Sequence, residues 1–165
     1  MKASKFLYAL MFFFGSFNLN AQFFEGAGNS ITNLGYKIGD FSYIVAGSNY
    51  ALADFLSIGL GIEYALADEL EVPFSIEFRG TFHAGYLMDL KKSDIQFGYH
   101  NDLSGSQGIH GIYQYAISDF FGFYGRSNVY FTRPDEFNQV HDQSNLSFEF
   151  GIMFRTMGVG NYGGF

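Results

Sequence analysis

The chain has 165 residues, which is enough for one domain, and it contains no Cys, which excludes disulfides, thiolate metal sites and a lipoprotein anchor. Its formal net charge is −7, which argues against nucleic-acid binding. Charged residues make up 15% of the chain and aromatic residues 21%, and such a composition suits a surface that contacts lipid better than one that contacts water.

The first residues have the order of a secretory signal peptide. Lys2 and Lys5 precede an apolar run over 6–14, and cleavage is predicted after Ala21. The run is far shorter than the roughly 20 residues that a membrane-spanning helix needs. We therefore expect residues 1–21 to be a cleaved export signal and residues 22–165 to form the mature domain.

The rest of the chain alternates apolar and polar residues with a period of two, which is the signature of β-strands. The clearest runs, where Phe, Leu, Ile and Tyr fill one face, are 55–66, 74–86 and 146–155. Less regular runs lie near 30–38, 41–51, 94–103, 108–117 and 120–132.

The connections between these runs alternate in length. Short polar turns are expected at 52–54, 91–93 and 118–119, and longer loops at 67–72, 104–107 and 133–145. Short turns on one side and longer loops on the other are typical of transmembrane barrels. The sequence therefore predicts an all-β fold, an eight-stranded antiparallel transmembrane up-and-down β-barrel with both termini on the periplasmic side.

Alternation alone does not say which face of the strands points outward. The apolar faces are too bulky to fill the interior of a small barrel, so we expect them to face lipid. The polar faces would then form a lumen network of ion pairs that comprises Glu63, Glu77, Arg79, Arg126, Glu149 and Arg155. Interfacial girdles would be supplied by Tyr43, Tyr50, Tyr64, Tyr86, Tyr99, Tyr115 and Tyr130. The alternative is a soluble periplasmic barrel that carries a ligand in an apolar interior.

The last predicted strand combines alternating aromatic residues with an embedded glycine. Its sequence over 148–155 is Phe-Glu-Phe-Gly-Ile-Met-Phe-Arg, and the chain ends on Phe165. This segment resembles the assembly signal of small outer-membrane barrels of the OmpX and OmpA-transmembrane type. The resemblance implies recognition by the barrel-assembly machinery through Phe148, Phe150, Gly151, Phe154 and Phe165.

Three histidines fall on polar faces of neighbouring predicted strands. His83, His100 and His110 are expected at similar heights, and Asp102 shares the parity of His100. Three imidazoles and a carboxylate could bind zinc or another divalent metal. The alternative is that they join the polar lumen network, and no other cofactor is indicated.

Two further activities to consider for such a barrel are lipid hydrolysis and passage of solutes through a pore. Some small outer-membrane barrels that resemble this chain deacylate lipid A with a Ser, a His and a Glu. His100 and Ser104 could act in this way, although that family places its His and Ser two residues apart and here they are four apart. An open pore is not expected, because side chains fill the interior of an eight-stranded barrel.

The sequence therefore favours a structural or interaction protein of the outer membrane rather than an enzyme. Its expected partners are outer-membrane lipid, the barrel-assembly machinery, and an envelope protein or surface ligand bound by loop 133–145. A lipid hydrolase and a soluble ligand carrier remain the alternatives.

Overall fold

The computed structural model describes residues 28–39, 41–66, 74–88, 90, 92–103, 105–132 and 145–156. The predicted signal peptide over 1–21, Ser104, residues 133–144 of the longest loop, and Phe165 lie outside the described residues. Within those ranges, no helix has the length and apolar character needed to cross a membrane.

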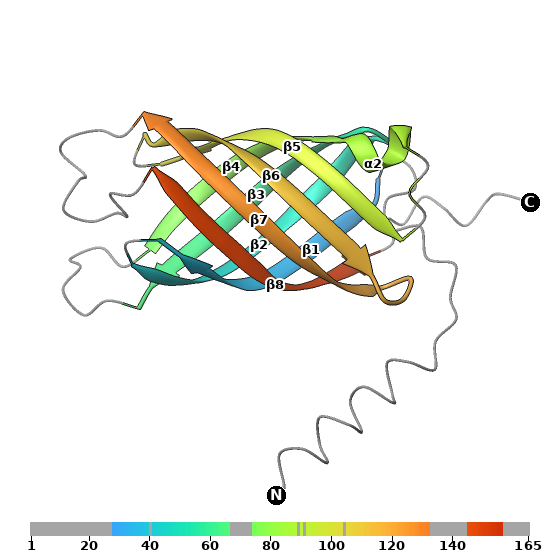
Figure 1. Cartoon of the computed structure of the whole chain (residues 1–165), viewed down its shortest axis with the longest axis horizontal. Coiled ribbons are helices and arrows are strands. Elements are labelled where there is room, and N and C mark those ends of the chain that lie inside the picture. The colour runs from blue at the N-terminus through green and yellow to red at the C-terminus, as the bar shows by residue number, and fades with distance from the viewer. Residues whose placement is uncertain are drawn as a thin grey trace, which may run out of the picture.

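The strands form one closed antiparallel barrel (Figure 1). In chain order they are β1 (Ser30–Ile38), β2 (Ser42–Ala53), β3 (Leu56–Ala65), β4 (Phe74–His83), β5 (Ser93–Asp102), β6 (Gln107–Ala116), β7 (Phe121–Thr132) and β8 (Leu146–Thr156). Each strand pairs with its neighbours in sequence, and β1 pairs with β8 to close the barrel. The predicted fold class, an eight-stranded antiparallel up-and-down barrel, is confirmed.

The short helix α2 (Ala84–Leu87) follows β4 directly. The predicted strand over 74–86 is therefore too long, because the chain turns after His83. At this turn the amide of Gly85 donates to Asp94 Oδ1 at 3.1 Å, and a Cβ on Gly85 would collide with Asp94. This approach of the turn to β5 is possible only for glycine.

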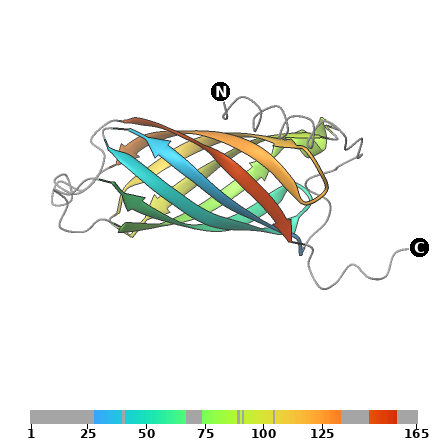
Figure 2. The same ribbon diagram turned by 90° about the horizontal axis from the view of Figure 1, so that it is seen from below.

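The helix α2 lies at one end of the barrel, which we call the α2 end; the opposite end is the far end. The antiparallel order places the start of β1 and the end of β8 at the α2 end, as Figures 1 and 2 show. Turns 54–55 and 117–120 also lie there, because each joins the end of an even-numbered strand to the start of the next odd-numbered strand.

The two faces of each strand have opposite character. In β3, for example, Ile58 and Ile62 are exposed on the outer face, whereas Ser57 and Glu63 are buried on the inner face. The outer face of the barrel is covered with exposed Phe, Leu, Ile and Tyr side chains from all eight strands. The inner face carries most of the buried polar and charged side chains.

Two of the tyrosines assigned to interfacial girdles face inward instead. Tyr43 and Tyr130 are buried, whereas Tyr50, Tyr64 and Tyr99 are exposed as predicted. The prediction is wrong for these two because both lie against the buried ammonium group of Lys37.

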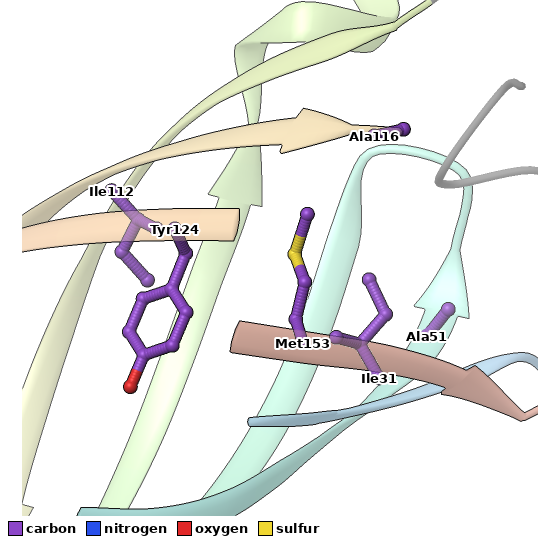
Figure 3. Close-up of a cluster of buried hydrophobic side chains, with 6 residues drawn as sticks. All are labelled: Ile31, Ala51, Ile112, Ala116, Tyr124 and Met153. Carbon is purple, nitrogen blue, oxygen red and sulfur yellow. The ribbon is translucent and has the colours of Figure 1, made fainter. Parts of the chain in front are cut away.

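Apolar side chains gather inside the barrel near both ends. The cluster near the α2 end comprises Ile31, Ala51, Ile112, Ala116, Tyr124 and Met153 (Figure 3). A smaller cluster near the far end comprises Tyr43, Val45 and Ala65, with Phe41 packed against it. Glu77, Arg126 and Glu149 lie between these two clusters, and Lys37 and Glu63 lie beside the second.

Candidate functional site

A buried ion network crosses the middle of the barrel. Arg126 on β7 contacts Glu77 on β4 through Nη2 and Oε1 at 2.7 Å, and Glu149 on β8 through Nη1 and Oε2 at 3.4 Å. Glu77 Oε1 also lies 3.4 Å from Nε of Arg79. Because β4 does not pair with β7, the contact between Glu77 and Arg126 spans the interior, whereas Arg126 and Glu149 are register partners on the neighbouring strands β7 and β8. We call Glu77, Arg79, Arg126 and Glu149 the central network.

Two uncharged residues complete the central network. The hydroxyl of Tyr124 donates to Glu149 Oε1 at 2.5 Å, and Asn33 Nδ2 donates to the Tyr124 hydroxyl at 3.3 Å. Both side chains occupy inward positions, on β7 and β1. Neither residue was predicted to join the network, because only charged residues were assigned to it. The signal in the sequence is that Tyr124 alternates in step with Arg126 on β7, and Asn33 with Lys37 on β1.

Glu63, which was predicted to join the network, pairs separately near the far end. Its Oε2 accepts a hydrogen bond from Lys37 Nζ at 2.7 Å, and Lys37 also donates to the Tyr130 hydroxyl at 2.9 Å. The ammonium group lies 4.8 Å from the centre of the Tyr43 ring, within cation–π range. Sequence reasoning missed Lys37, which is buried with its partner.

Arg155 is also apart from the central network. It pairs in register with Ile31 at the α2 end, six residues beyond Glu149 along β8. At about 3.4 Å per residue, its backbone is roughly 20 Å from that of Glu149. The structure thus unites four of the six predicted network residues.

The predicted metal cluster is divided. His100 and His110 lie on neighbouring strands with ring centroids 5.7 Å apart and nearly parallel. His83, however, is level with Gln96 of β5, four residues from His100 along that strand, and its ring is engaged elsewhere. Asp102 accepts a hydrogen bond from the amide of Ser106. Across the part of the chain that the structure describes, no group of three or more His, Cys, Asp or Glu side chains could hold a metal ion.

The stacked histidines are short of hydrogen-bond partners. His110 Nε2 lies 3.1 Å from Thr81 Oγ1. Both ring nitrogens of His100 and Nδ1 of His110 are buried without a hydrogen-bond partner among the described residues. Buried polar atoms are nearly always satisfied, so ordered water is the natural partner for these nitrogens.

A different histidine takes part in a hydrogen-bonded relay that the sequence analysis did not anticipate. His83 Nε2 lies 2.8 Å from Ser57 Oγ, and His83 Nδ1 lies 2.6 Å from Asp94 Oδ2. All three side chains are buried at the α2 end. Ser57 is the second residue of β3, His83 the last of β4 and Asp94 the second of β5. The only signal of this relay in the sequence is that its three residues fall on inward positions at the same end of three consecutive strands.

The predicted assembly signal lies on the outer face of the last strand. Phe148, Phe150 and Phe154 are exposed on β8. Gly151 sits opposite Gly35 of β1, and a Cβ there would collide with the carbonyl oxygen of Leu34. The three phenylalanines therefore form a row of outward-facing aromatic side chains, and Gly151 allows the backbones of β8 and β1 to approach closely.

No protein-family model matches the chain, and no curated protein matches its sequence. Its fold is similar to the crystal structure of the N-terminal β-barrel domain of Pseudomonas aeruginosa OprF. The TM-score is 0.58 at 10% sequence identity, over 80% of this chain and 100% of that chain. It is also similar to the solution NMR structure of the de novo designed TMB2.3, with a TM-score of 0.49 at 10% identity, over 81% of this chain and 98% of that chain. The likeness to the OprF domain shows an outer-membrane-type barrel fold and leaves the activity open.

Proposed function

We propose that the chain is a small outer-membrane β-barrel with a structural or interaction role in a Gram-negative cell envelope. The observation that carries this proposal is the inverted distribution of polarity. Large apolar side chains cover the outside of the barrel, and Lys37, Glu77, Arg126 and Glu149 are buried inside it.

The outer surface favours contact with hydrocarbon. Exposed apolar patches on soluble monomers rarely exceed a few hundred Å². Here exposed apolar side chains occur on every strand and around the whole circumference. The polar interior likewise argues against a soluble carrier, whose ligand pocket would be lined mainly by apolar side chains.

The interior supports a barrel without an open pore. The interior of an eight-stranded barrel is just wide enough for side chains to fill. The central network bridges β4 to β7 and β8, and apolar clusters lie near either end. Water and ions would have to displace paired charges to pass.

The expected partners follow from this placement. Outer-membrane lipid would cover the apolar outer face, where a groove of about 520 Å³ is bordered by Phe97, Tyr113, Phe148 and Phe150. The barrel-assembly machinery would recognise β8. A contact between loop 133–145 and an envelope protein or surface ligand stays a prediction, because residues 133–144 lie outside the described residues.

Bilayer conductance tests the closed interior. The full chain, expressed in a Gram-negative host and purified in detergent, is reconstituted into planar bilayers, with a large-pore porin as positive control. We expect no sustained conductance steps and no swelling of liposomes in small sugars. Stable porin-sized steps from folded protein would contradict a side-chain-filled interior.

A further inference from the structure

The relay of Ser57, His83 and Asp94 has the connectivity of a nucleophilic triad. The carboxylate meets Nδ1 of the imidazole at 2.6 Å, and the opposite ring nitrogen, Nε2, meets the serine hydroxyl at 2.8 Å. In this order the carboxylate fixes the tautomer in which Nε2 accepts the serine proton. Ser147, another buried serine, instead accepts a hydrogen bond from Asn128.

The carboxylate end of the relay is held by two further donors. Gln96 Nε2 donates to Asp94 Oδ2 at 2.8 Å, and the amide of Gly85 donates to Oδ1 at 3.1 Å. Both oxygens are thus fixed, which orients the imidazole before any substrate arrives. Such preorganisation is what positions a general base for catalysis.

A cluster of buried apolar side chains lies beside Ser57. Ser57 is the register partner of Ala51, and Ala51 belongs to the apolar cluster near the α2 end together with Ile31 and Met153 (Figure 3). An acyl chain is the substrate group that would pack against these side chains once the buried cluster opens.

We propose that Ser57 is the nucleophile of a hydrolytic site for carboxylic esters of apolar acyl chains, with His83 as general base and Asp94 as its positioning residue. This activity goes beyond the proposed envelope role. It also differs from the pair His100 and Ser104, since it uses other residues at the other end of the barrel.

The chemistry balances with water as the co-substrate. Ser57 Oγ attacks the ester carbonyl carbon while its proton passes to His83 Nε2. The bond between the carbonyl carbon and the alkoxy oxygen then breaks, and the leaving alcohol takes that proton. Water repeats the sequence on the acyl-serine, which releases the carboxylic acid and regenerates Ser57.

Ser57 and His83 are both 0% exposed and lie at the α2 end, so a substrate reaches them through an opening at that end. The element at this rim is α2, a single turn without a side-chain cap at its N-terminus. Tyr86 and Leu87 are exposed on α2, and Met88 just after it, whereas Gly85 is buried and its amide holds Asp94 Oδ1. Movement of these exposed residues, with the hydrogen bond from Gly85 to Asp94 kept, is the step that admits substrate to the relay.

A covalent probe tests the nucleophile. The full chain, folded in detergent micelles, is treated with diisopropyl fluorophosphate, and the modified residue is found by mass spectrometry. We expect modification at Ser57 that is absent in Ser57→Ala and unchanged in the matched buried-serine variant Ser147→Ala. His83→Gln should slow modification by roughly 100-fold or more, as expected for loss of a general base.

The positioning role of Asp94 is tested by a measurement that would not change if Asp94 only stabilised the fold. Asp94→Asn should slow modification and alter its dependence on pH, and Asp94→Glu should restore part of the rate. Each variant is first shown to fold by its different migration on a gel before and after boiling.

The acyl source is resolved by comparing p-nitrophenyl butyrate with vesicles of phosphatidylethanolamine. Hydrolysis of both assigns the site to membrane lipid, and hydrolysis of the butyrate alone assigns it to small esters. Folded wild-type protein that is neither modified at Ser57 nor more active than Ser57→Ala would overturn the proposal. The proposed envelope role would not be affected in that case, because it does not depend on Ser57 and the same gel shows that the barrel folds.

Discussion

Lys37 is a buried cation whose charge is balanced by a single carboxylate contact. It donates to Glu63 and Tyr130 and lies over the Tyr43 ring. Removing one partner of such a pair leaves an uncompensated buried charge, whereas removing both partners together can be nearly neutral. The residue therefore offers a clean test of how the interior is stabilised.

We predict that Lys37→Met lowers the free energy of unfolding by about 3–5 kcal/mol, because Glu63 is left buried without its cation. The double variant Lys37→Met/Glu63→Leu should recover most of this loss. The measurement is urea unfolding in detergent, followed by the fraction of barrel-like migration on unboiled gels. Additive losses in the double variant would show that the two side chains are not coupled.

The interior residues also show how much of the network could be predicted from the sequence. Parity along the strands correctly placed Glu77 and Arg126 on one polar face, but it could not pair them, since partners across a barrel depend on the shear between strands. The register of β4 against β5, which pairs His83 with Gln96, separates His83 from His100. Lys37 was overlooked because a lysine near a strand end is ordinarily expected at the surface.

At the scale of elements, strand positions could be predicted closely from alternation. The structure places β1 at the expected 30–38 and β7 within a residue of the expected range. The exception is the end of β4, where α2 replaces the last three predicted strand residues, 84–86. A contact between Gly85 and Asp94, nine residues apart along the chain, decides this turn and leaves no periodic signal.

Glycines within strands should differ in their tolerance of a methyl group. A Cβ at Gly98 would collide with the carbonyl oxygen of Gly80 and the His110 ring, whereas a Cβ at Gly125 would meet nothing within 4 Å. We predict that Gly98→Ala destabilises the barrel by about 1–3 kcal/mol. Gly125→Ala should be neutral or stabilise it by up to about 1 kcal/mol. Urea midpoints of the two variants check this, and equal midpoints would contradict the close packing at Gly98.

The last strand should matter more for assembly than its neighbour. Phe154 on β8 and Phe131 on β7 are both exposed on the outer face, so they make a matched pair. We predict that Phe154→Ser reduces the folded, membrane-inserted fraction in cells more than Phe131→Ser does, because β8 carries the proposed assembly signal. Pulse-labelling followed by unboiled gels measures that fraction. Equal losses would assign the effect to apolar area alone.

For the whole molecule, the account depends on which surface meets lipid. Low charge, abundant Phe and Tyr, and period-two alternation predicted the barrel and its strand number. The closed order of strands and the outward apolar face agree with that prediction. Composition could not reveal the relay of Ser57, His83 and Asp94, because it depends on three strands meeting at one end of the barrel.

The most direct test of the central claim is the location and heat-modifiability of the full chain in a Gram-negative host. Membrane fractions are separated on a density gradient and run on gels with and without boiling. The account predicts recovery with the outer membrane and different migration before and after boiling. Recovery as a soluble periplasmic protein with identical migration would contradict it.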